Sequence, residues 1–288
     1  MTTPSFKTIL ISGIILFACT SCGNQQSVAT PSDTTQATAA DTTHAIPSIK
    51  TDSVIYTVNG KSSKGYIAYD ENKKGKLPIV VLIPEWWGVN SYTKGRSRQL
   101  AELGYFAIDA DLYGNGDTAS NPQQAMAFTK PYYTNPKLAL SAVESAIAKA
   151  SGFPQADTSR IAAIGYCFGG FIVLNAAKMG APLKAAVSFH GDLSGVQPKR
   201  DMIRGAILIC QGGADQFVPE AAQMAFKKSM DSVGAHYTFI SYPGAMHAFS
   251  NPNATALGEK FKLPIAYNGA ADTASWKAMQ DIFATTLK

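Results

Sequence analysis

A cysteine between two glycines is the feature of this chain best suited to covalent chemistry. The segment GYCFG at 165–169 follows the apolar run 160–164 and precedes a helix-like stretch, 170–178. A strand, a sharp turn and a helix in this order form a nucleophile elbow, with Cys167 where most such elbows carry Ser. The glycines allow close approach of strand and helix, and the helix N-terminus favours a thiolate. The alternative is a structural cysteine in a glycine-rich turn.

An acid and a base follow the cysteine in the chain. The apolar strand predicted at 206–210 leads into a glycine-rich loop that carries Asp215. The strand predicted at 237–242 leads into a loop that carries His247. The order nucleophile, Asp, His is that of one of the known triad lineages and differs from two others. We therefore predict that Cys167, Asp215 and His247 form a triad.

Other interpretations of these residues stay open at this stage. Asp215 could cap a helix that begins near Pro219, and His247 could satisfy a hydrogen bond within its loop. Two further histidines compete for the role of base. His190 precedes Asp215 and breaks the order, and His236 lies at the wrong end of its predicted strand.

Residues 1–22 have the features of a lipoprotein-type signal peptide. The mostly apolar stretch 9–18 is too short to span a bilayer as an ordinary helix. It ends at a lipobox-like run in which Cys19 follows a small residue and has Leu16 three positions before it, with Cys22 as the second candidate. We expect an exported bacterial lipoprotein, periplasmic or at the cell surface, anchored through lipid on one of these cysteines. An ordinary secretory signal is the alternative.

The rest of the chain divides into a tether and one domain. Residues 23–50 are mostly small and polar, so they cannot bury enough apolar surface to offset their ordering entropy and are expected to be a flexible linker. Residues 51–288 suffice for a single domain with a substantial core. The net charge of +5 is small and its basic residues are scattered, which gives no indication of a nucleic-acid partner.

Strands alternate with helices along the predicted domain. The Asn59-Gly60 pair predicts a tight hairpin. Strands are expected at 53–58, 65–69, 77–84, 106–112, 160–164, 185–190, 206–210 and 237–242, and helices at 92–103, 136–150, 170–178 and 275–287. This pattern predicts an α/β fold: a mostly parallel sheet with helices on both faces and an antiparallel N-terminal edge hairpin. Active sites in such sheets lie at the carboxyl ends of the strands.

Five segments together resemble the dienelactone hydrolase family of α/β-hydrolases. They are PEWWG at 84–88, DLY at 111–113, GYCFGG at 165–170, GAD at 213–215 with VP at 218–219, and HAF at 247–249. The resemblance extends over 52–287. It implies the α/β-hydrolase fold, hydrolysis of a small-molecule ester or lactone, and neither a metal nor an organic cofactor. It leaves the oligomeric state open.

The resemblance also assigns roles to individual residues. It implies Cys167 as nucleophile, His247 as base and Asp215 as the group that orients His247. It further implies that Glu85 hydrogen-bonds the resting thiol and helps to activate it once substrate binds. A carboxylate beside a thiol disfavours the thiolate, so such protection is physically reasonable. The alternative for Glu85 is a solvated loop carboxylate.

By the same resemblance, the backbone N–H groups of Trp86 and Phe168 form the oxyanion hole. The aromatic residues Trp87, Tyr113 and Phe249 are expected to line an apolar substrate pocket, although aromatic residues at strand ends can equally be core. Dienelactone hydrolase itself holds a substrate carboxylate with arginines, and the matching stretches 114–117 and 250–252 contain none. A dienelactone substrate is therefore not indicated.

The expected mechanism is ester or lactone cleavage through a thioester on Cys167. The first alternative is a non-catalytic ligand-binding lipoprotein on a hydrolase fold. The second is a thiol-redox protein that uses Cys167 and Cys210, although no Cys-x-x-Cys pair lies at the elbow. A disulfide between these cysteines would remove the nucleophile, so Cys210 is expected to be a small core residue.

Overall fold

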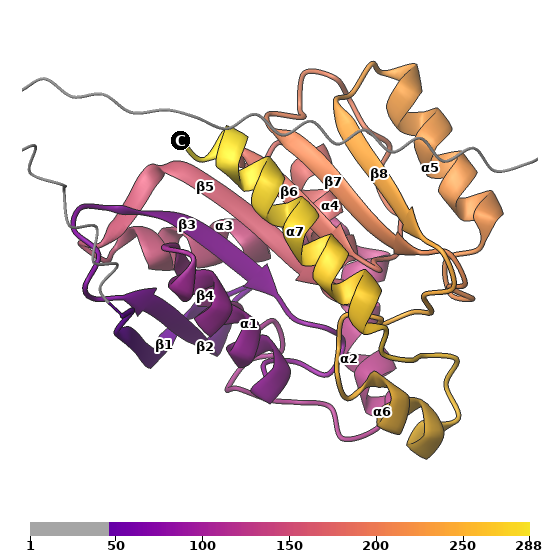
Figure 1. Cartoon of the computed structure of the whole chain (residues 1–288), viewed down its shortest axis with the longest axis horizontal. Helices are drawn as coiled ribbons and strands as arrows, with labels where there is room; N and C mark the ends of the chain where they lie inside the picture. The colour runs from indigo at the N-terminus through magenta and orange to yellow at the C-terminus, as the bar shows by residue number, and fades with distance from the viewer. Residues whose placement is uncertain (1–45) are drawn as a thin grey trace, which may run out of the picture. The chain divides into compact units, whose positions relative to one another are not determined.

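An eight-stranded sheet organises the computed structural model, which describes residues 46–288 (Figure 1). The expectations for the signal peptide, for Cys19 and Cys22, and for most of the linker lie outside these residues. The strands are β1 (Ile49–Val58), β2 (Lys61–Asp70), β3 (Leu77–Ile83), β4 (Phe106–Asp109), β5 (Ala156–Tyr166), β6 (Ala185–Phe189), β7 (Ala206–Gly212) and β8 (Tyr237–Tyr242). The helices are α1 (Ser91–Glu102), α2 (Pro122–Thr134), α3 (Lys137–Ser151), α4 (Phe168–Lys178), α5 (Glu220–Ser232), α6 (Ala254–Phe261) and α7 (Gly269–Thr286).

The strand order is β1-β2-β4-β3-β5-β6-β7-β8. Strands β1 and β2 form the antiparallel edge hairpin around Asn59-Gly60, where both residues have positive φ angles. Strand β2 also runs antiparallel to β4, and the pairs from β4 through β8 are all parallel. The predicted fold class is therefore confirmed.

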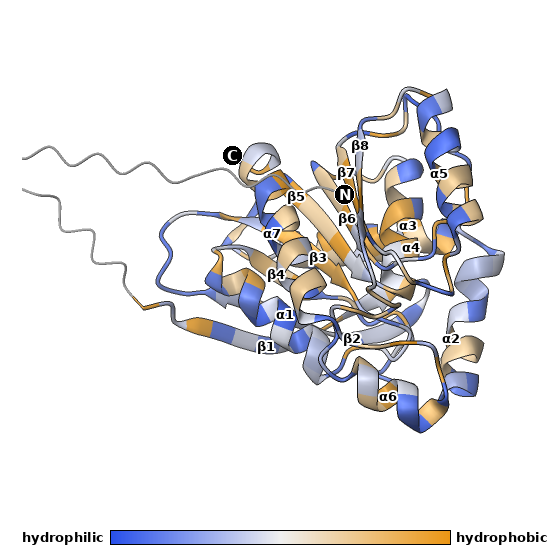
Figure 2. Ribbon diagram, turned by 45° about the vertical axis from the view of Figure 1, so that its right-hand side comes forward, coloured by the Kyte–Doolittle hydropathy of each residue, from blue (hydrophilic) through white to orange (hydrophobic). Residues whose placement is uncertain are grey.

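Alternating side chains of the central strands supply two cores. In β3, Ile79, Val81 and Ile83 enter the core that α3, α4 and α5 cover, while Val80 and Leu82 enter the core that α1 and α7 cover. All five side chains are fully buried, as expected for a strand with helices on both faces. Figure 2 shows hydrophobic colour concentrated in the central strands, and a mixture of hydrophobic and hydrophilic colour along the helices around them.

Several elements differ from the sequence expectations in extent. Strand β1 begins at Ile49, two residues before the expected start of the domain, and pairs with Asp70 at the end of β2. Helices α2 and α6 were not predicted because each buries only a few residues, many of them small or polar. Helix α7 begins six residues earlier than expected, where the Asn268 side chain accepts a hydrogen bond from the N–H of Ala271.

The parallel strands bring five polar residues to one edge of the sheet. Glu85 follows β3, Cys167 follows β5, Asp192 follows β6, Asp215 follows β7 and His247 follows β8. Carboxyl ends of parallel strands meet at one edge, so residues spread over 160 positions come together. Among residues 46–288, no helix has both the length and the apolar character needed to cross a membrane.

Candidate active site

The elbow holds Cys167 in a strained backbone conformation. Its φ is 54° and its ψ is −117°, between the end of β5 and the first turn of α4. Glycine is required on both sides: a Cβ on Gly165 would lie 2.1 Å from the Gly169 oxygen, and a Cβ on Gly169 would lie 2.1 Å from the Ile83 oxygen. Strain of this kind persists where the surrounding structure imposes it, commonly at functional sites.

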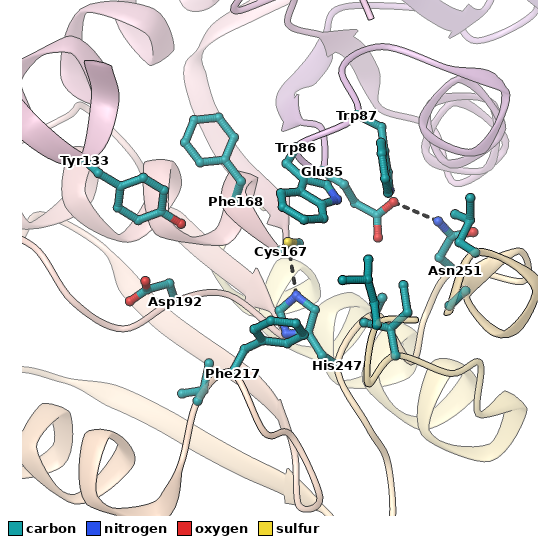
Figure 3. Close-up of a pocket in the computed structure, with 16 residues that line it drawn as sticks. Glu85, Trp86, Trp87, Tyr133, Cys167, Phe168, Asp192, Phe217, His247 and Asn251 are labelled. Atoms are coloured by element: carbon teal, nitrogen blue, oxygen red, sulfur yellow. Dashed lines mark hydrogen bonds between the residues drawn. The ribbon is translucent and has the colours of Figure 1, made fainter. Parts of the chain in front are cut away.

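His247 joins the cysteine to the acid. Its Nε2 lies 3.1 Å from the Cys167 Sγ, and its Nδ1 lies 2.9 Å from the Asp215 Oδ2 (Figure 3). Burial alone would lower the pKa of His247, but the Cys167 sulfur and the hydrogen bond to Asp215 outweigh it and raise that pKa well above the ordinary value. The geometry thus suits a thiolate paired with an imidazolium.

Asp215 is held by three neutral donors besides the histidine. The Gln211 amide donates to Oδ2 at 2.7 Å, and the backbone N–H groups of Phe217 and Val218 donate to Oδ1 at 2.9 and 3.2 Å. Asp215 therefore caps its own turn, while Pro219 precedes α5 without a side-chain cap. Sequence reasoning missed Gln211, which is fully buried and fixes the carboxylate that orients His247.

Glu85 is buried rather than solvated, with 2% of its surface exposed. Its Oε2 accepts a hydrogen bond from the Asn251 amide at 2.7 Å. Burial raises the pKa of Glu85 to about 7, although Asn251 and the charges of His247 and Arg96 favour its ionised form. The resemblance implied a bond between Glu85 and the resting thiol. In the structure the Glu85 carboxylate instead accepts the hydrogen bond of the Asn251 amide, and the Cys167 sulfur contacts His247.

The two residues expected to form the oxyanion hole flank the cysteine. Phe168 is the first residue of α4, and Trp86 follows β3. Both line the cavity beside Cys167. Within the part of the chain that the structure describes, neither backbone N–H has a hydrogen-bond acceptor. Two such donors beside a nucleophile are the arrangement that stabilises a developing oxyanion.

A cavity of about 180 Å³ opens onto the cysteine. Its apolar lining consists of Trp86, Trp87, Tyr133, Phe168, Phe217, Val218, Ala248, Ala254, Leu257, Leu263 and Ile265, and its polar lining of Glu85, Cys167, Asp192, His247 and Asn251. Sequence reasoning missed most of these residues because α2 and the segment around α6 supply several of them.

Two of the three predicted pocket aromatics do not line this cavity; Trp87 does. The Tyr113 hydroxyl instead donates to the backbone oxygen of Trp86 at 2.9 Å. This bond fixes the backbone of a residue whose N–H is expected to form the oxyanion hole. Phe249 is fully buried and packs edge-on against His190. The prediction of Tyr113 and Phe249 as pocket residues was wrong because both side chains pack beneath the site.

His190 supports the elbow without replacing His247 as the base. The Cys167 N–H donates to the Phe189 oxygen at 2.9 Å and also to the His190 Nδ1 at 3.1 Å, and the His190 Nε2 lies 2.7 Å from the Ser250 hydroxyl. Complete burial lowers the pKa of His190 well below its ordinary value and keeps the ring neutral. His236 is exposed just before β8, at the amino end of that strand, whereas His247 follows its carboxyl end.

Cys210 is a core residue of β7. It is fully buried, and burial raises the pKa of its thiol to about 12. Cys210 and Cys167 are both free thiols. Within residues 46–288, no group of three or more His, Cys, Asp or Glu is arranged to hold a metal ion.

The match to known proteins covers most of the domain. Residues 64–287 match the Dienelactone hydrolase family. The chain belongs to this family. It is 31% identical, over 73% of its length and 72% of the relative's, to a Methylorubrum extorquens protein provisionally named a carboxymethylenebutenolidase.

Two solved structures share both sequence and fold with this dienelactone hydrolase family member. The protein titled m3DLH is 32% identical with a TM-score of 0.79, and a dienelactone hydrolase-like promiscuous phosphotriesterase from metagenomic libraries is 30% identical with a TM-score of 0.78. Each alignment covers 83% of this chain and 99% of the other. Membership of the family identifies the chain as a hydrolase of the ester or lactone type.

Proposed function

We propose that this protein hydrolyses small-molecule esters or lactones by covalent catalysis on Cys167. One observation carries the proposal: His247 bridges the Cys167 sulfur and the Asp215 carboxylate, at 3.1 and 2.9 Å, on the wall of a partly open cavity. Nucleophile, base and orienting acid in this geometry are the components of a catalytic triad. A binding protein needs no such strained, histidine-paired thiol.

The first half of the reaction forms a thioester. The Cys167 thiolate attacks the ester carbonyl, and the N–H groups of Trp86 and Phe168 stabilise the resulting oxyanion. Collapse of this intermediate breaks the bond to the alcohol oxygen, which takes the proton from His247 Nε2. A thiolate leaves far more readily than an amide nitrogen, so the intermediate from an amide partitions backward. An ester partitions forward when its alcohol is activated or is protonated by His247 as it leaves.

The second half regenerates the enzyme. Neutral His247 removes a proton from water, and the hydroxide adds to the thioester carbonyl. Collapse expels the Cys167 thiolate, releases the carboxylic acid and restores the thiolate–imidazolium pair. Asp215 keeps the His247 ring in the orientation that serves both steps.

The experiment compares turnover of p-nitrophenyl acetate by wild type, Cys167→Ala and Cys210→Ala. We expect Cys167→Ala to lose turnover while its circular dichroism is unchanged, and Cys210→Ala to keep it. Equal activity of Cys167→Ala and wild type would refute covalent catalysis at Cys167. A wild type that binds esters without cleaving them would favour the alternative, a non-catalytic ligand-binding lipoprotein.

We also propose that the hydrolase domain works outside the cytoplasm of a bacterium, held at a membrane by lipid on Cys19 or Cys22. The support is the apolar stretch that ends in a small residue and a cysteine, followed by a small, polar segment. Contact with the membrane would then be through the anchor alone.

A further inference from the structure

Among the described residues, the cavity beside Cys167 is lined by two acidic side chains, and its one basic side chain, His247, is already paired with Cys167 and Asp215. Asp192 and Glu85 both line it, and no lysine or arginine does so within the described residues. Figure 3 shows Asp192 beside Tyr133 on one side of Cys167, and Glu85 beside Asn251 on the other. Apart from the triad residues, the charged groups of this cavity are therefore carboxylates.

The two carboxylates differ in how far they are free to contact a substrate. Glu85 is buried, bonded to the Asn251 amide, and has a pKa raised by burial to about 7. Asp192 is half-buried, and its Oδ1 accepts only the backbone N–H of Ser194, at 2.7 Å. Asp192 is thus the carboxylate that can meet a group of the substrate.

No protein cation neutralises Asp192 at close range. Among the described residues it has no ion pair within 4.0 Å. Lys178 is the cation that it influences, but Lys178 is buried outside the cavity, with its Nζ 3.5 Å from the Ser194 oxygen. Burial lowers the pKa of Lys178 to about 8 against the opposing influence of Asp192.

Exposed aromatic rings accompany this carboxylate on the cavity wall. Tyr133 and Phe217 line the cavity and are 42% and 49% exposed. Tyr133, on α2, packs against Phe171 of α4. Phe217 packs edge-on against His247. A carboxylate with partly exposed aromatic rings on the same cavity wall is the set of groups that attracts an ammonium ion.

We propose that Asp192, with the ring faces of Tyr133 and Phe217, forms a subsite for a positively charged group of the substrate. The enzyme then cleaves esters that carry an ammonium group faster than neutral esters of the same shape, and anionic esters slowest. This inference rests on the proposed ester hydrolysis and specifies its substrate class.

The test uses acetate esters that differ in charge. Acetylcholine and 3,3-dimethylbutyl acetate are isosteres with and without a positive charge, and 4-acetoxybutanoate carries a negative charge. Release of acetate gives kcat/KM for each. We expect about a tenfold preference for acetylcholine over the neutral ester, and about tenfold for the neutral over the anionic ester, as for one partly screened charge interaction.

The variants locate the effect. Asp192→Asn keeps the shape and removes the charge, so the cationic-to-neutral ratio should fall to about 1–3. The control is Asp201→Asn, which changes an exposed carboxylate that does not line the cavity and should keep the wild-type ratio. Tyr133→Leu should also lower the ratio. Each ratio compares two esters on one preparation, so partial unfolding does not alter it.

The outcomes separate this inference from the function beneath it. Hydrolysis of the neutral ester with no preference for acetylcholine would overturn the subsite and leave ester hydrolysis standing. An equal preference in Asp192→Asn and wild type would also overturn it. Failure to hydrolyse these three esters and p-nitrophenyl acetate as well would overturn the proposed function itself.

Discussion

Replacing Glu85 with glutamine should stabilise the fold and impair catalysis at the same time. The carboxyl is 2% exposed, and burial raises its pKa from the ordinary 4.5 to about 7. At about 1.36 kcal/mol for each pK unit, this difference corresponds to roughly 3 kcal/mol of stability. Gln cannot ionise, and its side-chain oxygen can still accept the Asn251 hydrogen bond.

The sign of the pH dependence follows from the direction of the pKa change. Between pH 4.5 and about 7 the folded carboxyl holds its proton while the unfolded one has lost it. The contribution of Glu85 is therefore most favourable below pH 4.5 and is lost as the pH rises to about 7. Glu85→Gln should match wild type near pH 4.5 and exceed its free energy of unfolding by roughly 3 kcal/mol at pH 8.

Activity should move in the opposite direction. The Glu85 carboxylate lines the cavity and interacts with the charge of His247. Loss of this negative charge should therefore destabilise the protonated form of His247. We expect kcat/KM at pH 8 to fall by about tenfold, the size of one charge interaction of about 1.4 kcal/mol.

A second buried carboxyl supplies the control. Asp109 at the end of β4 is fully buried away from the cavity, and burial raises its pKa to about 7 as well. Asp109→Asn should raise stability at pH 8 in the same way and leave kcat/KM unchanged. Urea unfolding at pH 5 and pH 8, with ester turnover on the same samples, measures both effects. A Glu85→Gln variant no more stable than wild type at pH 8, or equally active, would refute the reasoning.

Three further outcomes are expected. Gly169→Ala should cost more than about 3 kcal/mol of folding stability, measured by urea unfolding, because its Cβ would meet a backbone oxygen of β3 at 2.1 Å; unchanged stability would contradict the elbow geometry. Gln211→Leu should lower kcat by about tenfold with little change in KM, since Asp215 loses a donor at 2.7 Å; an unchanged kcat would show that Gln211 does not position it. Mass spectrometry of the native protein should find a diacylglyceryl group on Cys19 or Cys22, and an unmodified mature chain starting beyond Cys22 would reject the anchor.

Local patterns in the sequence predict the strands and the triad because each is marked within a few residues. The glycines around Cys167 and the strands before Asp215 and His247 are such marks, and parallel topology then brings the three side chains together. The resemblance added Glu85, but its partner depends on Asn251, 166 positions away in the chain, which no local pattern reveals.

The cavity wall was the least predictable part. Tyr133 lies on α2, which buries few apolar residues and so gives a weak helical pattern. Phe249 looked like a pocket residue because it follows the histidine closely, but its side chain points into the core beneath His190. Which face a loop side chain takes is set by tertiary packing rather than by its neighbours in the chain.

The acyl-enzyme is the most direct test of covalent catalysis. His247→Gln should be acylated by p-nitrophenyl acetate more slowly than wild type, because Cys167 has lost the imidazolium that favours its thiolate. Deacylation should be slowed far more, because water has lost its base, so the acyl-enzyme should accumulate. Rapid quenching followed by peptide mass spectrometry should then find one acetyl group on the peptide that contains Cys167. Sustained ester hydrolysis by wild type, with no acetyl group on Cys167 in this variant or with the acetyl group on another residue, would contradict the account.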